Sequence, residues 1–321
     1  MSKRAERAGA TAPLYITMGE PAGVGPEIAV AAYRALDGHV GRRALKLIGD
    51  PAVFRACGRV PAGALIDTGV RATRMPGKPS PRNAAAVTAA ISHATQAAMC
   101  GEAAAIITAP IQKATLTAAG FAFPGHTEYL QHLTGAKRAV MMLASARLRV
   151  VPQTIHIPLS DVPAQLNAGS IFETASIVLT ALQHDFGTAK PRLAVAGLNP
   201  HAGEAGTIGK EEKTVILPAL RRLRARGHHV LGPLSADTLF HDAARKQYDA
   251  ALCMYHDQAL IPIKTLSFWD GVNVTLGLPI VRTSPDHGTA LDIAGKKKAD
   301  TRSMIAAIHM AATIAARRTK A

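Results

Sequence analysis

The sequence is poor in cysteine and in aromatic residues, and it contains no long apolar run. Its three cysteines, Cys57, Cys100 and Cys253, lie far apart and form no CxxC pair, so neither a disulfide framework nor a thiolate zinc site is indicated. Aromatic residues make up only 4% of 321 residues, which argues against an aromatic-rich all-β design. No segment is long and apolar enough to span a bilayer, and the N-terminus lacks the apolar core of a secretory signal. We therefore expect a cytoplasmic protein with no membrane partner.

Acidic residues are also few, since 37 Lys and Arg face 22 Asp and Glu, giving a formal charge of +15. Such an excess is compatible with a basic, zinc-binding nucleic-acid protein. The basic residues, however, concentrate in an N-terminal tail (Lys3, Arg4, Arg7), in residues 221–226, at 296–298 and at the C-terminal end. These runs lack the interleaved aromatics of a single-strand binding platform. Solvated tails and helix faces are the favoured interpretation, so we expect no nucleic-acid partner.

Hydrophobic residues make up 48% of the chain, which is ample for a sizeable core. Short β-branched runs alternate with Ala-rich helical stretches, a pattern typical of an α/β protein with a mostly parallel sheet covered by helices. We predict strands at 14–17, 44–50, 103–110, 139–145, 148–158, 192–199 and 250–257. We predict helices at 26–36, 81–99, 161–168, 171–184, 210–227 and 301–317.

Three histidines fall at the ends of predicted strands: His156, His201 and His256. Ligands bind at the carboxyl ends of strands in an open parallel sheet. Three neutral imidazoles suit Zn²⁺ or a similar divalent ion, and an open position could hold a substrate oxygen. With 13 histidines in the chain, any single one could equally be a packed or exposed side chain.

Two polar turns are candidates for anion binding. PGHTEYL places His126, Thr127 and Glu128 together, either to present N–H groups to an anion or to cap the following helix. NPHAGEAGTIGKEE has glycines that allow close approach of a phosphate but equally suit a surface loop. Neither this segment nor GEPAGVGPE (19–27) is a GxGxxG, so the Rossmann fingerprint is absent.

The region from residue 255 to 288 is densest in polar side chains. Lys264 and Arg282 could clamp a phosphorylated or carboxylated substrate, or form loop salt bridges. Asn273 lies between them in sequence, and Asp257 adjoins His256. Asp237, in GPLSADTLF, is a further carboxylate candidate or a helix cap.

Taken together and in order, five segments resemble the 4-hydroxythreonine-4-phosphate dehydrogenase family. They are ITMGEPAGVGPEIA, ITAPIQKATLTAAGFAFPGHTEYL, GLNPHAGEAGTIGKEE, GPLSADTLF and the stretch from YHDQALIPIK to TSPDHGTALDIAG. The resemblance implies an isocitrate/isopropylmalate-dehydrogenase-like fold with two α/β lobes, the active site in the cleft between them, and an obligate homodimer. We expect residues 1–130 plus 285–321 to form the first lobe, and 131–284 to form the second, which makes dimer contacts.

The resemblance also implies the chemistry. The family's metal ligands fall on His156, His201 and His256, with the third ligand contributed by the other subunit. Substrate contacts fall on His126, Thr127, Lys264, Asn273 and Arg282, and we expect Asp237, Asp257 and Lys264 to take part in catalysis. The family reaction uses NAD or NADP to oxidise the C3 hydroxyl of 4-phosphohydroxy-L-threonine, and the β-keto acid then loses CO₂ to give 3-amino-2-oxopropyl phosphate for pyridoxal 5'-phosphate synthesis. The metal would be Zn²⁺, Mg²⁺ or Co²⁺.

A close alternative is a paralogue of the same fold that acts on D-threonate or D-erythronate 4-phosphate, or on an aromatic dihydrodiol dicarboxylate. Two departures from the family pattern are visible. Ala259 stands after HDQ and Lys297 stands in GKKKAD, both where glycine is common. If Ala259 occupied a position needing positive φ, it would shift the loop of His256.

Overall fold

The computed structural model describes residues 9–320, so the predicted basic tail at Lys3, Arg4 and Arg7 lies outside the described residues. Contacts within the chain divide it into two compact units, 1–139 with 272–321, and 140–271. The chain thus leaves the first unit and returns to it, so neither unit is a continuous stretch of sequence.

The first unit is a mostly parallel sheet with strand order β2-β3-β1-β5-β12-β11, and β4 pairs with β3. The strands β3, β1, β5 and β12 run parallel, while β2 and β11 are antiparallel to their neighbours. The strands are β1 (Leu14–Thr17), β2 (His39–Val40), β3 (Arg43–Gly49), β4 (Leu65–Asp67), β5 (Ala105–Thr108), β11 (Val272–Leu276) and β12 (Arg282–Pro285). The helices are α1 (Gly25–Ala35), α2 (Pro51–Arg55), α3 (Ala84–Met99), α4 (Lys113–Ala118), α5 (His126–Thr134) and α11 (Arg302–Lys320).

The second unit has strand order β6-β7-β10-β8-β9, with only β6 antiparallel. Its strands are β6 (Val140–Ala144), β7 (Arg149–Pro152), β8 (Arg192–Ala196), β9 (His229–Leu234) and β10 (Ala250–Cys253). Its helices are α6 (Val162–Gln165), α7 (Ala168–His184), α8 (Leu217–Ala225), α9 (Asp242–Arg245) and α10 (His256–Ser267). A π-helical turn, η5 (Glu212–Ile216), leads into α8.

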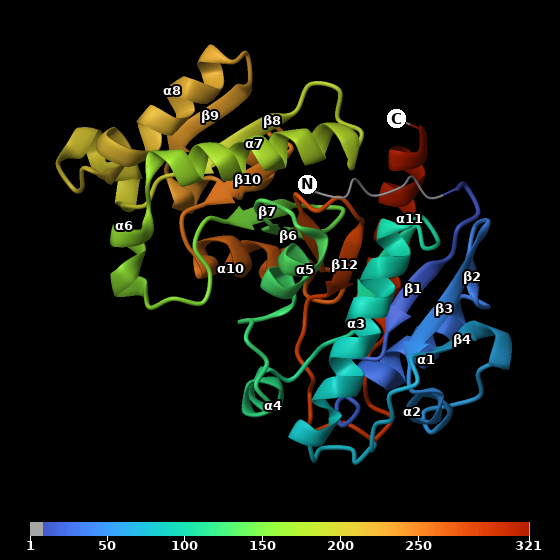
Figure 1. Ribbon diagram of the computed structural model, residues 1–321. Helices are drawn as coiled ribbons and strands as arrows, with labels where there is room; N and C mark the ends of the chain where they lie inside the picture. Colours follow the sequence, from blue (N-terminus) through green and yellow to red (C-terminus); the bar gives the residue numbers. More distant parts are fainter. Residues whose placement is uncertain (1–8, 321) are drawn as a thin grey trace. The chain divides into compact units, whose positions relative to one another are not determined.

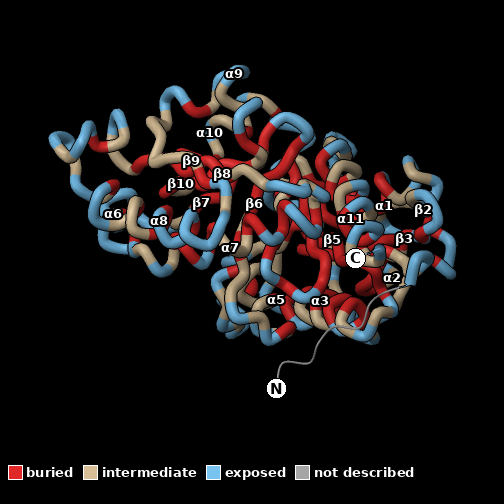
Figure 2. The backbone as a smooth tube through the Cα atoms, turned by 90° about the horizontal axis from the view of Figure 1, so that it is seen from above, coloured by how far each residue is buried: buried red, intermediate tan, exposed pale blue. Residues whose placement is uncertain are grey.

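Helices cover both faces of the strands in each unit, as parallel sheets require. In the first unit α3 packs on the face that carries Ile48 and Ile106, while the Thr283 hydroxyl of β12 donates to the Ala307 carbonyl of α11. In the second unit α7 and α10 are drawn on opposite sides of β7 and β10 (Figure 1). Figure 2 shows the buried positions concentrated along the strands. The α/β class predicted from the sequence is confirmed.

Most predicted elements coincide with observed ones, but β7 ends at Pro152 instead of continuing to residue 158. Proline cannot donate to a sheet ladder, and the residues that follow form turns. The strands β2, β4, β9, β11 and β12 and the helices α2, α4, α9 and α10 were not predicted, and α5 was expected only as the helix that the PGHTEYL turn could cap.

The predicted lobe boundaries stood at 130/131 and 284/285, whereas the contact-defined units change at 139/140 and 271/272. Residues 272–285 join the first unit because β11 pairs with β12, and β12 pairs with β5. Within residues 9–320, no helix is both long and apolar enough to cross a membrane.

Candidate active site

Arg282 opens β12 in the first unit and is buried, with 3% of its surface exposed. Its Nε and Nη2 donate to the Thr108 hydroxyl at 3.1 and 2.7 Å, and its Nη1 donates to the Thr275 hydroxyl at 2.8 Å. Burial lowers the pKa of Arg282 to about 10, and the negative charge of Glu128 only partly opposes this effect. A buried guanidinium bonded to hydroxyls rather than to a carboxylate is an incomplete ion pair, suited to an anionic ligand.

His126 begins α5, directly after the extended N-cap Gly125. The residue as a whole is partly exposed, but its Nε2 is buried and has no hydrogen-bond partner among the described residues. Burial, and then the charges of Arg282 and Lys113, hold the pKa of His126 well below its usual range. The ring is therefore neutral, and its Nε2 is available to a ligand that approaches the N-terminus of α5.

Asn273 lies on β11, where its register partner is Ser284 of β12. Side chains two residues apart on a strand share a face, so Asn273 lies on the face of Thr275, which receives the Arg282 hydrogen bond. The Oδ1 of Asn273 is buried and, within the described chain, unpartnered. Arg282, His126 and Asn273 thus bring a buried cation and two unsatisfied polar atoms to the first unit. Thr127 follows in the first turn of α5 and is half-buried.

Lys113 was not predicted as a site residue. It begins α4, and a Cβ added at Gly125 would lie 3.6 Å from its ammonium nitrogen. The Lys113 cation therefore lies beside the start of α5. The sequence offered little signal here, since a lysine after ITAPIQ reads as an ordinary helix start. Thr108 and Thr275 were missed for the same reason, because threonine is common in strands.

The three predicted metal ligands lie in the second unit, after neighbouring strands. His156 follows β7, His256 follows β10 and His201 follows β8, and β10 lies between the other two strands. The ring centres of His156 and His256 are 5.7 Å apart. Two imidazoles on one tetrahedral ion have ring centres about 5 Å apart, so this pair fits a shared divalent ion.

A cavity of about 270 Å³ is lined by both imidazoles and by Thr154, Ile155, Ile157, Leu159, Val162, Tyr255 and Asp257. The Nδ1 of His256 is hydrogen-bonded to the Asp257 carboxylate at 2.6 Å. This contact orients the ring and leaves Nε2 for a ligand, as carboxylates do behind metal-binding histidines. Gln258 ties the neighbouring loops together, because it donates to the Gly197 carbonyl and accepts from the Met254 amide.

His201 lies in a turn with left-handed backbone from 201 to 205, with φ values of 51°, 51°, 75°, 40° and 54°. Only Gly203 adopts this conformation without strain, and each of the other residues costs about 1–2 kcal/mol there. His156 also has a positive φ, of 48°. Strain of this kind concentrates at functional sites. Within residues 9–320, however, no group of three His, Cys, Asp or Glu side chains is close enough together to hold a metal.

Asp237 and Lys264 also belong to the second unit. The Ser235 hydroxyl lowers the pKa of Asp237, and the charge of His201 adds a smaller contribution, so this exposed carboxylate is ionised at neutral pH. Lys264 lies two turns after His256 on α10, with its ammonium 5.8 Å from the Phe268 ring centre. Ala259 is buried within α10 in helical conformation, so this departure does not require a positive φ or disturb His256. Lys297, by contrast, has a φ of 56°.

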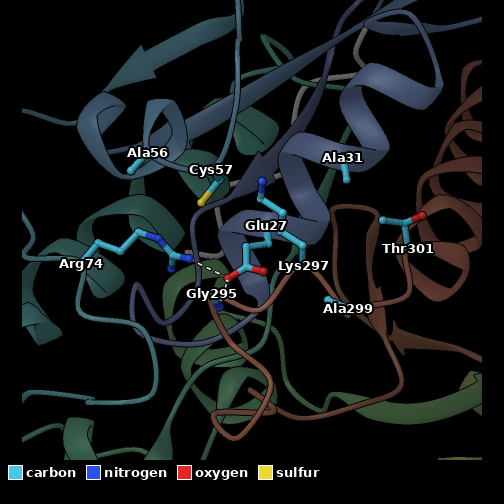
Figure 3. A pocket seen from close by; sticks show the side chains of 9 residues that line it. All are labelled: Glu27, Ala31, Ala56, Cys57, Arg74, Gly295, Lys297, Ala299 and Thr301. Carbon is cyan, nitrogen blue, oxygen red and sulfur yellow. Dashed lines mark hydrogen bonds and ion pairs between the residues drawn. The ribbon is translucent and has the colours of Figure 1, made fainter.

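Figure 3 shows a second cavity, of about 250 Å³, in the first unit. Arg74 points at Glu27 and bonds to it at 2.6 Å, and the Gly295 amide donates to the same oxygen. The charges of Arg74 and Glu27 pair with each other, and the Gly295 hydrogen bond fixes the loop at residue 295 to α1. Lys297 and Cys57 also line this cavity.

The glycine-rich segment at 19–25 does not form a nucleotide cradle. A Cβ at Gly19 would lie 2.6 Å from the Pro110 carbonyl oxygen, and one at Gly23 would lie 2.8 Å from that of Thr289. The space beside these glycines is filled by the chain's own backbone. The residues here therefore do not fit a cofactor pyrophosphate, and we assign no cofactor contact to them.

The basic stretch at 221–226 is largely engaged in packing. Arg222 and Arg226 stack over the Phe172 ring at 4.3 and 4.7 Å, and Arg224 donates to the carbonyls of Val230 and Gly232. Cation–π contacts of this kind stabilise α7 against α8. Three of the four arginines at 221–226 thus make contacts within the chain.

A divided α/β fold, with a buried arginine beside unpartnered polar atoms in one unit and a close histidine pair in the other, is an arrangement typical of enzymes. The match to relatives is specific. The family model described as "Pyridoxal phosphate biosynthetic protein PdxA" matches residues 37–311, and this chain belongs to that family.

The chain is 54% identical over 324 residues to a 4-hydroxythreonine-4-phosphate dehydrogenase of Roseobacter denitrificans, covering 96% of this chain and 98% of the relative. A crystal structure of that enzyme from Klebsiella pneumoniae has a TM-score of 0.81 at 36% identity, covering 95% and 100% of the two chains. A terephthalate 1,2-cis-dihydrodiol dehydrogenase from Burkholderia xenovorans is more distant, with a TM-score of 0.67 at 29% identity and 94% and 98% coverage.

An isocitrate dehydrogenase from Methylococcus capsulatus shares the fold alone, with a TM-score of 0.50 at 12% identity and 95% and 87% coverage. The predicted family and the isocitrate-dehydrogenase-like fold are confirmed, and the chain is a dehydrogenase.

Proposed function

We propose that this chain oxidises the C3 hydroxyl of 4-phosphohydroxy-L-threonine with NAD or NADP, in the cytoplasm. The resulting β-keto acid loses its carboxylate as CO₂ and leaves 3-amino-2-oxopropyl phosphate, a precursor of pyridoxal 5'-phosphate. The observation that carries the proposal is the incomplete ion pair around Arg282, which fits a small phosphorylated anion. The names of the relatives that match over nearly the whole chain support the same reaction.

The phosphate is the group that the first unit would bind. A bound phosphate gives Arg282 a full counter-charge, which offsets the effect of burial in lowering the pKa of Arg282. Neutral His126 donates one hydrogen bond from Nε2, and Thr127 adds donors at the positive end of α5. The orphaned Oδ1 of Asn273 accepts from a substrate hydroxyl or ammonium group. Anchoring the phosphate fixes C3 relative to the rest of the site, which lowers the entropic part of the barrier.

His156, His201 and His256 would hold a divalent ion, Zn²⁺, Mg²⁺ or Co²⁺, and the close pair His156 and His256 supports this assignment. When bound, the ion supplies Lewis-acid stabilisation of negative charge on the C3 oxygen. Asp257 orients the His256 ring, and ionised Asp237 is placed to accept a proton near His201. Lys264 neutralises substrate charge and is the proposed proton donor when the enolate is protonated after CO₂ leaves.

The active site is proposed to be shared across a homodimer, with a ligand supplied by the second copy. Large apolar side chains are exposed in the second unit at Ile157, Leu159, Ile261, Phe268 and Trp269. Ile157 and Leu159 also line the histidine cavity. A second copy covering this surface would bury apolar area beside the histidines, which is the usual basis of an obligate interface.

The alternative is a paralogue activity on D-threonate or D-erythronate 4-phosphate, or on an aromatic dihydrodiol dicarboxylate. The similarity to the more distant dihydrodiol dehydrogenase structure is the observation behind the dihydrodiol alternative. An assay of NAD(P) reduction with 4-phosphohydroxy-L-threonine and with D-threonate 4-phosphate separates the possibilities. Turnover of the first supports the proposal, and turnover of only the second contradicts it.

A His201→Ala variant tests the metal. We expect it to keep the fold, measured by circular dichroism, and to lose both bound metal and turnover. Full activity in a metal-free His201→Ala protein would overturn this part of the proposal. Salt-sensitive binding of DNA or RNA without dehydrogenase activity would instead support the nucleic-acid rival.

A further inference from the structure

Glu212 is a buried carboxylate, 3% exposed, at the start of the π-helical turn η5. Its Oε1 accepts from the backbone amides of Leu198 and Asn199 at 2.8 and 2.7 Å. Its Oε2 accepts from the Asn199 side-chain amide at 3.0 Å. All three donors belong to the two residues after Gly197, immediately before the turn that carries His201. Glu212 therefore holds that segment at several points from the other end of the loop.

The left-handed turn is also packed onto this carboxylate. A Cβ at Gly203 would overlap the Glu212 carboxylate, and a Cβ at Gly197 would lie 3.1 Å from its Oε1. The two glycines thus make room for Glu212, and Gly203 has a φ of 75° in the middle of the turn. Residues 197–199 and Gly203 thus lie against the Glu212 carboxylate.

The carboxylate itself is anchored from α8. Ile216, at the end of η5, is fully buried, and α8 follows directly with its buried Ala219, Leu220 and Leu223. A π-helical turn carries one residue more than an α-helical turn, and such turns are frequent at functional sites. Here it places Glu212 against the loop, while the neighbouring Glu211 accepts from the Asn199 side chain at 2.8 Å and from the backbone amides of residues 210 and 211.

We propose that Glu212 is the positioning residue of His201. It holds residues 198–205 in their strained conformation and so fixes the imidazole for the divalent ion, an inference that rests on the proposed function for the role of His201. A carboxylate is required because both of its oxygens accept hydrogen bonds. In a Glu212→Gln protein the amide nitrogen would face the Asn199 amide, donor against donor.

The test compares Glu212→Ala and Glu212→Gln with Glu211→Gln. This matched control changes the adjacent carboxylate, which accepts from the backbone amides of residues 210 and 211 and not from those of Leu198 and Asn199. Amide hydrogen exchange of the metal-free proteins reports on residues 198–209 directly. We expect at least tenfold faster exchange there in Glu212→Ala, a smaller increase in Glu212→Gln, and no more than a twofold change in the control. Exchange in α7 should stay at the wild-type rate, which separates loop release from unfolding.

Co²⁺ affinity is the second readout. We expect it to fall on the order of 10- to 100-fold in Glu212→Ala, as for other groups that orient metal ligands, and to stay within about twofold in Glu211→Gln. A folded Glu212→Gln protein with wild-type exchange and wild-type Co²⁺ affinity would overturn the inference. If wild-type and His201→Ala proteins bind Co²⁺ equally, the proposed metal site fails, and hydrogen exchange still decides whether Glu212 holds the turn.

Discussion

Replacing Arg282 by Met should separate stability from ligand binding, because the guanidinium is buried without a carboxylate bonded to it. The fall in its pKa from an ordinary value of about 12.5 to about 10 corresponds to about 3 kcal/mol by which burial disfavours the charge. Losing the hydrogen bonds to Thr108 and Thr275 costs about 1 kcal/mol each. The ligand-free variant should therefore match the wild type in free energy of unfolding or exceed it by about 1 kcal/mol.

Added phosphate should reverse this order of stability, so that the wild type has the higher free energy of unfolding. A ligand at one hundred times its Kd stabilises the folded state by about 2.7 kcal/mol, and we expect the wild type to gain stability from inorganic phosphate while Arg282→Met does not. Urea unfolding with and without phosphate measures both quantities. Arg71→Met, at an exposed ion pair with Asp67, is the matched control and should keep the wild-type response. An Arg282→Met protein that is several kcal/mol less stable yet still stabilised by phosphate would refute the reasoning.

Three further predictions concern the first unit. Lys297→Gly should raise the free energy of unfolding by about 1 kcal/mol, because Lys297 has a φ of 56°, and an unchanged or lower thermal midpoint would contradict this. Burial raises the pKa of the Glu20 carboxyl, so its contribution to stability is complete below the unfolded-state pKa and is lost as pH rises through the folded-state pKa. The stability of Glu20→Gln relative to the wild type should therefore increase from pH 4 to pH 8, and a constant difference in urea titrations would oppose this. Burial raises the pKa of the Cys57 thiol to about 11, so at pH 8 iodoacetamide should modify exposed Cys100 well before Cys57, as peptide mass spectrometry can show.

The sequence predicted secondary structure best where no functional polar side chain interrupts the apolar pattern of a strand. The run LYIT contains the β-branched Ile16 and Thr17 and is mostly buried, and β1 begins and ends where it was predicted. The strands β11 and β12 were missed because they carry Asn273, Arg282 and Ser284, polar side chains that interrupt the apolar pattern of a buried strand. In these strands, the polar residues that are suited to binding an anion are the same residues that interrupt the strand pattern in the sequence.

The conformation of the turn at His201 could not be predicted from the sequence for a different reason. Its left-handed backbone includes His201, Ala202, Glu204 and Ala205, none of which favours that conformation by itself. The conformation depends on the buried Glu212 carboxylate, which lies outside the turn and which no local pattern reveals. Helix α10 was obscured by Pro262 in its interior, since proline usually ends a helix.

The measurement that tests the central claim most directly is the stoichiometry of one reaction. Purified protein is incubated with 4-phosphohydroxy-L-threonine, NAD or NADP and a divalent metal, and reduced nicotinamide and CO₂ are both quantified. Oxidation at C3 followed by loss of the carboxylate predicts one CO₂ for each nicotinamide reduced. No nicotinamide reduction with this substrate, or reduction with no CO₂ released, would contradict the proposed reaction.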